Sequence, residues 1–345
     1  MKIVHITFGF KLGGLETMLI NIANEQVKQH EVCILLINDL IDDNLLKKVS
    51  SEVKIFYCGR KAQSRSLLPV VKLNFYLLKI RPDVIHVHAP KVANLLLPFF
   101  MRKVVYTIHD VTIGKKYLQR YRNCYSIAEC VRKDVLERTG IDAPVVYNGI
   151  KVDSIKAKEK YSKGSPFRIV QISRLDHRKK GQDILIKAIG LLQQKGVADI
   201  SLDIIGEGNS YDFLVELIHN LNIDNVVQLC GAREYSWVQE HLKDYDLLVQ
   251  PSIFEGFGLT VAEGMAAKLP VLVSDIDGPM EIIDNGKFGY FFEKGNVEDC
   301  ANKIEKIMST ANAQLIQDAW QHVDKCFSIS RTANTYIDKY RDLQK

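Results

Sequence analysis

The sequence lacks long apolar runs and is not rich in proline or glycine. Its longest uninterrupted apolar runs, such as residues 95–101, fall far short of the roughly 20 residues that a membrane-spanning helix needs. The first residues reach polar and glycine positions by Gly13, so the apolar stretch of a signal peptide is missing. Nine prolines and 21 glycines among 345 residues also exclude a fibrous or low-complexity protein. We therefore expect a globular, cytoplasmic protein.

Cysteine motifs are missing as well. The seven cysteines are odd in number, widely scattered and nowhere spaced as C-x-x-C, which argues against a disulfide framework and against a zinc site. The chain does have an apolar content of 47%, which is enough for a buried core and excludes general disorder. A length of 345 residues favours two domains.

Charge is unevenly divided along the chain. Residues 1–150 carry 22 Lys and Arg against 13 Asp and Glu, whereas residues 151–345 carry 24 against 28. A basic first half indicates an anionic partner, either nucleic acid or an anionic membrane surface. Aromatic residues are not interleaved with the basic ones, as stacking on single strands would require, so we expect no nucleic-acid partner.

Short β-branched apolar runs alternate with longer helical patterns, which is typical of βαβ units on parallel sheets. The expected strands form two series, residues 3–6, 32–37, 53–57, 84–87, 104–108, 125–128 and 145–147, then residues 168–172, 201–205, 226–229, 247–250 and 271–274. The lysine-rich residues 151–164 between them are interpreted as a linker.

The two series predict an α/β protein with two doubly wound, Rossmann-like domains. We place these at residues 1–160 and 161–328, and a helical pattern at residues 329–345 could pack back on the first domain. Ligands of open parallel sheets bind at the carboxyl ends of the strands, so two facing domains would hold a ligand in a deep cleft between them.

The most informative segment is residues 251–263. A glycine-containing loop follows an expected strand, and an apolar helical pattern begins at Leu259. The backbone N–H groups of Phe257, Gly258 and Leu259 would lie at the start of that helix and form an anion site.

Two glutamates eight residues apart, Glu255 and Glu263, bracket this anion site. Carboxylates beside a bound diphosphate would repel it, so we expect them to accept hydrogen bonds from hydroxyl groups on either side of it. A nucleotide sugar carries such hydroxyls on its ribose and its hexose. The alternative is that Glu263 is a solvated helix residue and Glu255 a helix cap.

A basic segment follows the first strand of the second series. Arg174 leaves the end of that strand, and Lys180 precedes Gly181 at the start of the next helical pattern. Both cations can therefore reach the same site and bind phosphate oxygens, Arg174 through its planar fork and Lys180 as a point charge. The alternative is an ordinary solvated loop.

Histidines mark two strand ends in the first series. His88 lies where strand 84–87 should open into the cleft, whereas His86 is interpreted as a packed core histidine. His109 and Asp110 follow strand 104–108 and are candidate acceptor-binding or orienting groups, with a structural turn as the alternative.

Residues 67–80 have an apolar helical pattern, and basic residues recur at a spacing of seven from just before it, Arg65, Lys72 and Lys79. An anionic bilayer attracts such a stripe by about 1 kcal/mol per charge near its surface. The alternative is a core-facing helix with a solvated basic side.

Taken together, four segments resemble the retaining glycosyltransferases of family 4. They are Glu255-x₇-Glu263 preceded by Pro251–Ser252, the turn Ser173–Arg174–Leu175 with Lys180–Gly181, Gly13–Gly14–Leu15–Glu16, and Tyr147–Asn148–Gly149. The resemblance covers nearly the whole chain and implies the GT-B fold.

The resemblance also implies roles for individual residues. Arg174 and Lys180 match the pair that holds the donor diphosphate, Glu263 the ribose ligand, and Glu255 the ligand of the donor-sugar hydroxyls. The other matches are Phe257, Gly258 and Leu259 as backbone donors, Gly14 as the glycine that approaches the diphosphate, His88 as the histidine near the reacting sugar, Gly206 as a glycine turn near the nucleoside, and Leu229 in the segment that packs the base.

Residues 275–277 read Asp-Ile-Asp, which in the other major glycosyltransferase fold would bind a metal carrying the nucleotide diphosphate. Because Arg174 and Lys180 already supply the positive charge, we expect no metal and no cofactor besides the nucleoside-diphosphate sugar.

The function that the resemblance implies is retaining transfer of a hexosyl or N-acetylhexosaminyl unit to a saccharide or lipid-linked acceptor in bacterial surface polysaccharide or lipopolysaccharide biosynthesis. We expect a peripheral contact with the anionic inner leaflet of the membrane. Two alternatives stay open, a sugar-nucleotide 2-epimerase and a nucleotide-sugar-binding subunit without turnover.

Overall fold

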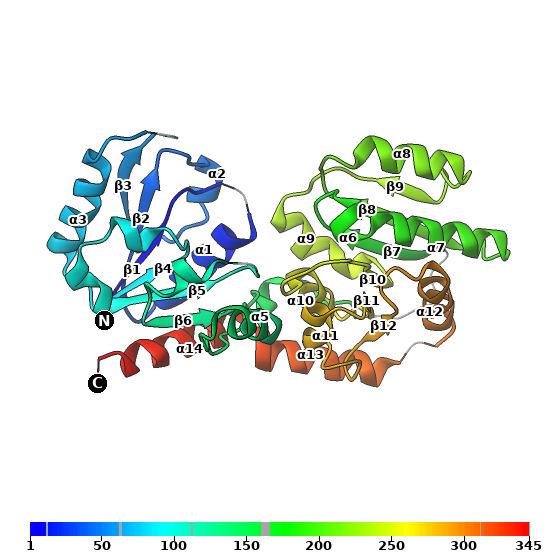
Figure 1. The fold of residues 1–345 in the computed structure, drawn as a ribbon. Helices are drawn as coiled ribbons and strands as arrows, with labels where there is room; N and C mark the ends of the chain where they lie inside the picture. Colours follow the sequence, from blue (N-terminus) through cyan, green and yellow to red (C-terminus); the bar gives the residue numbers. More distant parts are fainter. Residues whose placement is uncertain (12, 62–63, 112, 160–165, 311, 345) are drawn as a thin grey trace. The chain divides into compact units, whose positions relative to one another are not determined.

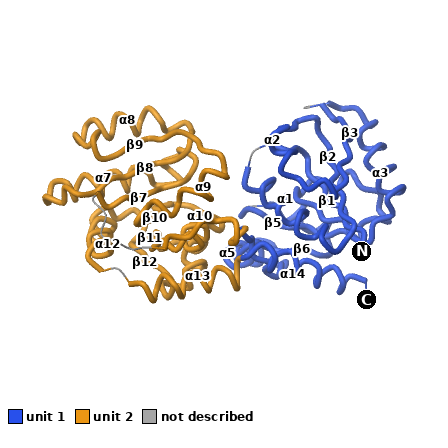
Figure 2. The backbone as a smooth tube through the Cα atoms, turned by 180° about the vertical axis from the view of Figure 1, so that it is seen from behind, with its two compact units in different colours: residues 1–150, 328–345 blue, residues 151–327 orange. Residues whose placement is uncertain are grey.

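The computed structural model describes residues 1–345 except residues 12, 62–63, 112, 160–165, 311 and 345. The described chain divides into two compact units (Figure 2). Unit 1 comprises residues 1–150 and 328–345, and unit 2 comprises residues 151–327. Each unit holds a six-stranded parallel sheet flanked by helices (Figure 1). The predicted fold class is confirmed.

The sheet of unit 1 has the order β3-β2-β1-β4-β5-β6. Its strands are β1 (Lys2–Thr7), β2 (Glu31–Asn38), β3 (Lys54–Arg60), β4 (Val84–Val87), β5 (Val104–Ile108) and β6 (Asn123–Ser126). Its helices are α1 (Gly14–Gln26), α2 (Asp43–Leu46), α3 (Leu68–Ile80), α4 (Lys115–Leu118), α5 (Glu129–Thr139) and α14 (Ile329–Asp342). The chain reverses its direction of travel across the sheet between β1 and β4, and this switch point is where doubly wound folds bind ligands.

The strands of unit 1 are β-branched and apolar because both faces of the sheet are covered. On one face, Leu19 and Ile20 of α1 pack with Val32, Ile34 and Leu36 of β2 in a continuous buried cluster. This packing places the amino end of α1 beside the carboxyl end of β1.

The C-terminal helix α14 completes unit 1, although it is far away in the sequence (Figure 2). The backbone N–H of Ile329 donates to the carbonyl of Ile150 at 2.8 Å, and the Thr332 hydroxyl donates to the carbonyl of Tyr147 at 2.8 Å. A side chain at Gly149 would come within 2.8 Å of the Cα of Ile329. Glycine at position 149 therefore lets the helix lie directly on the backbone.

The sheet of unit 2 has the order β12-β11-β10-β7-β8-β9. Its strands are β7 (Phe167–Ile172), β8 (Ile200–Ile205), β9 (Val227–Leu229), β10 (Leu247–Gln250), β11 (Val271–Ser274) and β12 (Tyr290–Phe292). Its helices are α6 (His177–Lys180), α7 (Gln182–Gln194), α8 (Tyr211–Asn220), α9 (Tyr235–His241), α10 (Leu259–Ala266), α11 (Asp277–Ile282), α12 (Val297–Ser309) and α13 (Ala313–Phe327). Here the switch point lies between β7 and β10.

Three details differ from the sequence analysis. Residues 145–147 form no strand, and Val145 makes only an isolated bridge with Ser126. The three-residue strand β12 was not expected. Residues 151–159 belong to unit 2, where Lys158 forms an ion pair with Asp246 at 2.5 Å, so the expected linker is in part a packed segment and the units divide after Ile150.

None of the helices in the described part of the chain combines the length and the apolar character that a bilayer-spanning segment requires.

Candidate functional site

The switch point of unit 2 brings together the residues that the sequence analysis assigned to a donor diphosphate. β7 and β10 are neighbours, so the loops that follow them leave the same edge of the sheet side by side. Lys180, at the end of α6, forms an ion pair with Glu255, in the loop after β10. The Lys180 and Glu255 side chains are 20% and 17% exposed.

This ion pair leaves binding capacity on both partners. An ammonium group has three donors, and Glu255 uses one of those of Lys180. The bonds that Glu255 accepts from Lys180 and Gln250 both end on Oε2, and no other described residue donates to Oε1. Lys180 can therefore still bind a phosphate while Glu255 binds a hydroxyl.

Backbone contacts hold the two loops together. The N–H groups of Ile253 and Phe254 donate to the Lys179 carbonyl at 2.8 and 3.1 Å. Gly181 has a φ of +65°, and a side chain on it would meet the carbonyl group of Pro251, with the carbonyl carbon 2.9 Å away. Glycine at position 181 is thus required for the close approach of the two loops.

Three buried glutamines that the sequence analysis did not consider donate hydrogen bonds to the assigned residues. Gln171 donates to the Lys180 carbonyl at 2.9 Å, and Gln182 donates to the Arg174 carbonyl at 2.9 Å. Gln250 donates to the Glu255 carboxylate at 3.1 Å. The signal for two of them was a polar residue at the end of an apolar strand.

The carbonyl oxygen of each of these glutamines is buried with no hydrogen-bond partner among the described residues. Their amides cannot be turned round, since each –NH₂ group faces a carbonyl or carboxylate that only accepts. The three glutamines therefore act toward the two loops as hydrogen-bond donors in a fixed orientation.

Arg174, in the loop after β7, lies beside the glycine turn that follows β8. The Arg174 side chain is exposed. Gly206 has a φ of +145°, and a side chain there would come within 2.9 Å of the Ser173 carbonyl carbon. Gly206 thus sets the path of the loop that carries Arg174, and Leu229 packs against the buried core of unit 2.

The start of α10 has the geometry of an anion site. Gly258 precedes the helix with a φ of +101°, and Leu259 is its first residue. The first N–H groups of a helix have no partner within it. Phe257 is buried and packs edge-on against Phe327 at 5.6 Å, so only its backbone could reach a ligand.

Glu263 lies inside the unit, on the second turn of α10. Its side chain is buried, and Tyr235 hydrogen-bonds to it. Burial raises the pKa of the Glu263 carboxyl to about 7, and the bond from Tyr235 opposes this shift. The alternative that Glu263 is a solvated helix residue is therefore wrong.

In unit 1, three predicted residues lie at the carboxyl ends of β4 and β5. The His88 ring, expected where the strand opens into the cleft, is 2% exposed and is hydrogen-bonded to His5 at 3.0 Å and to His109 at 3.2 Å. His109 is only partly buried and Asp110 is exposed. His86 is buried as expected. Of the two hydrogen-bonded histidines, His109 is thus the one that solvent can reach.

Gly14 is the first residue of α1, which follows the switch-point strand β1. It is exposed, and a side chain on it would meet no atom of the described residues within 4 Å. Packing alone therefore does not explain a glycine at this position.

Two groups of residues bear on metal binding. Asp275 of the Asp-Ile-Asp segment accepts a hydrogen bond from the backbone N–H of Lys294 at 2.7 Å, which is a structural role. Among the described residues, the one cluster with the spacing of a metal site is formed by His5, His86 and His88, whose ligand atoms lie within 4.8 Å of one another. Each of their ring nitrogens already has a hydrogen-bond partner.

Sequence families match both units. The family described as glycosyltransferase family 4 matches residues 12–154, and the family described as glycosyl transferases group 1 matches residues 153–319. The chain belongs to the glycosyltransferases.

Curated relatives of this glycosyltransferase include enzymes of cell-surface polymers. The lipopolysaccharide 1,6-galactosyltransferase of Escherichia coli is 24% identical over 331 residues, which cover 90% of this chain and 89% of that protein. The poly(ribitol-phosphate) alpha-N-acetylglucosaminyltransferase of Staphylococcus aureus is 30% identical over 187 residues, which cover 53% of this chain and 36% of that protein.

A solved structure shows the same fold. HepE of Anabaena, in complex with UDP, has a TM-score of 0.80 and 20% identity, and the match covers 99% of this chain and 100% of that one. The glycosyltransferase therefore has the GT-B fold, with two Rossmann-like domains, as the sequence resemblance implied.

Proposed function

We propose that this glycosyltransferase moves a hexosyl or N-acetylhexosaminyl unit from a nucleoside-diphosphate sugar, with retention at the anomeric carbon, to a saccharide or lipid-linked acceptor in bacterial surface polysaccharide or lipopolysaccharide assembly. The observation that carries the proposal is the meeting of Lys180 and Glu255 at the switch point of unit 2, between Arg174 and the start of α10. The names of the Escherichia coli and Staphylococcus aureus relatives state transfer to lipopolysaccharide and to poly(ribitol-phosphate), which supports the acceptor class.

The donor half of the proposal lies in unit 2. As the glycosidic bond breaks, positive charge grows on the sugar and negative charge on the leaving diphosphate. Arg174, Lys180 and the first N–H groups of α10 would stabilise the diphosphate, since preorganised charges act most strongly where charge develops. Glu263 would accept hydrogen bonds from the ribose, and Oε1 of Glu255 from the transferred sugar. The UDP bound to the Anabaena structure supports a nucleotide donor.

The proposed reaction needs no metal ion, because Arg174 and Lys180 would supply the positive charge at the leaving group. The leaving phosphate would take the proton of the acceptor hydroxyl as the new bond forms on the same face of the sugar. Activity that persists in excess EDTA would support this part, and activity restored only by added Mg²⁺ or Mn²⁺ would contradict it.

The test of the function is a donor screen followed by a product analysis. UDP-, GDP- and ADP-sugars are first screened by thermal shift, and the donor that binds is incubated with lipid-linked and free saccharide acceptors. Transfer with an α-linked product from an α-linked donor supports retention. Isomerised nucleotide sugar without acceptor would favour the 2-epimerase, and binding without any turnover would favour the non-catalytic subunit.

Matched variants then test the residues. Arg174→Ala or Lys180→Ala should each cost about 2–4 kcal/mol in transition-state stabilisation, since each removes a preorganised charge. Lys179→Ala, an exposed neighbour, is the control and should keep wild-type turnover. Glu263→Ala should mainly weaken nucleotide binding, whereas Glu255→Ala should lower turnover more than nucleotide affinity. Wild-type turnover in the Lys180 variant would refute the phosphate assignment.

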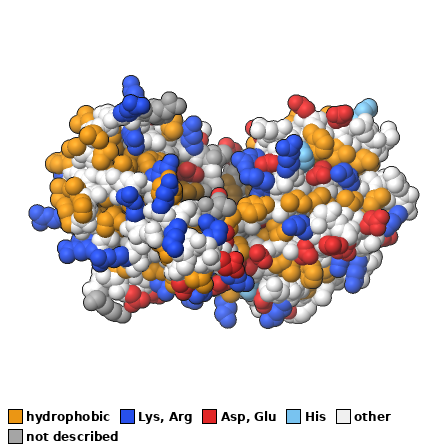
Figure 3. All heavy atoms as spheres, viewed as in Figure 1, with side chains coloured by type: hydrophobic (Ala, Val, Ile, Leu, Met, Phe, Trp, Pro, Cys, Tyr) orange, Lys and Arg blue, Asp and Glu red, His pale blue; other side chains and the backbone are white. Residues whose placement is uncertain are grey.

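We further propose that helix α3 of unit 1 contacts an anionic membrane. Its exposed face carries apolar side chains, among them Leu68 and Phe75, which are 72% and 59% exposed. Lys72 and Lys79 are exposed on the same helix, and the space-filling view shows hydrophobic and basic side chains facing solvent over this part of unit 1 (Figure 3). A solvated face would be polar, so the combination of apolar and basic groups favours the surface of an anionic bilayer.

Vesicle co-sedimentation tests the membrane contact. The wild-type protein should bind vesicles of phosphatidylglycerol and phosphatidylethanolamine at low salt, and Leu68→Ser with Phe75→Ser should abolish binding. Phe213→Ser with Val215→Ser removes two other exposed apolar groups, 42% and 44% exposed, from α8 and should leave binding unchanged. No binding by the wild-type protein, or equal loss in both variants, would refute the contact.

A further inference from the structure

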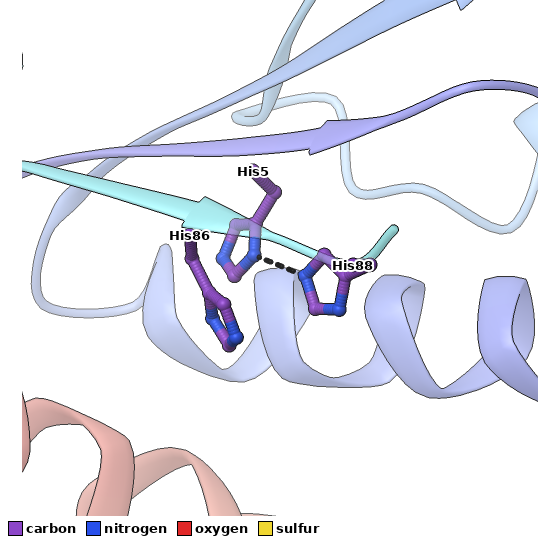
Figure 4. A group of neighbouring side chains, drawn as sticks. All are labelled: His5, His86 and His88. Carbon is purple, nitrogen blue, oxygen red and sulfur yellow. Dashed lines mark hydrogen bonds between the residues drawn. The ribbon is translucent and has the colours of Figure 1, made fainter. Parts of the chain in front are cut away.

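A chain of buried hydrogen bonds runs through the core of unit 1 to His109. His5 lies on β1, and His86 and His88 come from β4 and the residue after it (Figure 4). His5 Nδ1 lies 3.0 Å from His88 Nε2, and His88 Nδ1 lies 3.2 Å from His109 Nε2. At the other end, His5 Nε2 lies 2.8 Å from Oε1 of Gln26, the last residue of α1.

The three histidines that the hydrogen bonds connect in series, His5, His88 and His109, are neutral at pH 7. Burial lowers the pKa of His5 and of His109 to about 4, and it holds the pKa of His88 well below its usual value. A neutral imidazole has one N–H donor and one acceptor nitrogen. Each ring in the chain must therefore donate in one direction and accept from the other.

The Gln26 amide decides the direction. Its carbonyl oxygen faces His5 and can only accept, so His5 carries its proton on Nε2 and accepts at Nδ1. His88 must then donate from Nε2 and accept at Nδ1, which obliges His109 to donate from Nε2. His109 is left with an unprotonated Nδ1, and no described residue donates to that atom.

A second branch of hydrogen bonds begins at the same amide. The Gln26 –NH₂ group faces the Tyr340 hydroxyl at 3.5 Å, and that hydroxyl lies 2.6 Å from His86 Nδ1. His86 Nε2 continues to the Thr107 hydroxyl at 2.7 Å. Both branches thus start at Gln26, but only the first one reaches His109.

We propose that Gln26 is a positioning residue that fixes His109 in the Nε2–H tautomer, through His5 and His88, and so presents the Nδ1 lone pair at the carboxyl end of β5 to a hydroxyl group of the sugar acceptor. The tautomer follows from the geometry of unit 1 alone. The identity of the hydroxyl rests on the proposed function.

Ring-nitrogen NMR tests the tautomer directly. Long-range ¹H–¹⁵N spectra of the full chain with labelled histidine separate protonated from unprotonated ring nitrogens, and His109→Asn identifies the signals of His109. The wild-type spectrum should show His109 with Nε2 protonated. A His109 ring protonated at Nδ1 overturns the proposal, whether or not any variant folds. If added Zn²⁺ shifts the signals of His5, His86 and His88, these residues form a metal site, and the proposal is overturned as well.

Three variants separate positioning from general packing. Gln26→Met removes the acceptor at similar size and should give a mixture of His109 tautomers. Gln26→Glu keeps an acceptor facing His5 and should restore the wild-type tautomer. Thr107→Val disturbs only the second branch and should leave the tautomer of His109 unchanged. A shift in Thr107→Val equal to that in Gln26→Met would overturn the proposal.

Kinetics test the link to the acceptor. Gln26→Met should lower kcat/KM for the acceptor roughly tenfold, as expected for the loss of one hydrogen bond, with donor affinity unchanged and with recovery in Gln26→Glu. A mixed tautomer with unchanged acceptor kinetics would overturn the functional step. A wild-type protein that turns over no sugar at all would refute the proposed function, while the NMR result would still decide the tautomer.

Discussion

Gly181 offers the sharpest test of how the donor site is built. It joins α6 to α7 with a φ of +65°, and its missing side chain is what allows the Pro251 carbonyl to come so close. Gly181→Ala therefore changes two things, the backbone preference and the contact between the loops. Gly196, in the same unit, also has a positive φ, +85°, but a side chain there would meet no atom within 4 Å. Gly196→Ala therefore changes only the backbone preference.

The magnitudes follow from this difference. A left-handed conformation costs a non-glycine residue about 1–2 kcal/mol, and both variants should lose this much. At Gly181 the added carbon would also overlap the Pro251 carbonyl group, so the backbone must shift, and overpacking of this kind costs a further ~1–3 kcal/mol. The free energy of unfolding should thus fall by about 2–5 kcal/mol in Gly181→Ala and about 1–2 kcal/mol in Gly196→Ala.

Tryptophan fluorescence in urea measures this difference in the right part of the molecule. The two tryptophans of the chain, Trp237 and Trp320, both lie in unit 2. Gly181→Ala should in addition weaken binding of the nucleotide that the donor screen identifies, because the shift involves Lys180, the neighbour of Gly181, and the loop that leads to the start of α10, whereas Gly196→Ala should not. Equal stability losses in the two variants, with equal nucleotide affinity, would refute the argument that the contact at Gly181 shapes the site.

Three further predictions concern other elements. Because the pKa of Glu263 is raised above its unfolded value to about 7, unit 2 should lose stability as the pH rises from about 4.5 to 7, by up to about 3 kcal/mol, and Glu263→Gln should flatten this dependence in urea titrations at several pH values. Asn296→Ala removes the side-chain cap that accepts from the Asp299 N–H at 2.9 Å, and should cost about 1 kcal/mol in the same unfolding assay. Gly149→Ala should loosen α14, since the new side chain would lie 2.8 Å from the Cα of Ile329, and faster amide hydrogen exchange in α14 would show it.

Local patterns in the sequence predicted the fold well where the elements are long and periodic. The strands that flank both switch points were predicted almost to their observed ends, because strands buried on both faces are short continuous apolar runs. β12 was missed because it is only three residues long and includes the exposed Phe291. Val145 was wrongly placed in a strand because an apolar β-branched run does not require a sheet partner.

The candidate site was predicted in its chemistry more than in its contacts. The rule that parallel strands bind ligands at their carboxyl ends was enough to place Lys180 and Glu255 near one another. It could not show that Lys180 and Glu255 form a direct ion pair, because the residues of a loop follow no repeating pattern that would fix the direction of their side chains. The burial of His88 could not be predicted from the sequence either, because it depends on the packing of His5 from a neighbouring strand.

The return of α14 to unit 1 has a consequence for synthesis. A ribosome makes residues 1–150 first, but the hydroxyl groups that Tyr336 and Tyr340 direct toward Thr107 and His86 are made only after all of unit 2. While unit 2 is being translated, the nascent first half therefore lacks these two partners in its core. Completion of this half has to follow the synthesis of unit 2, and α14 supplies the missing part.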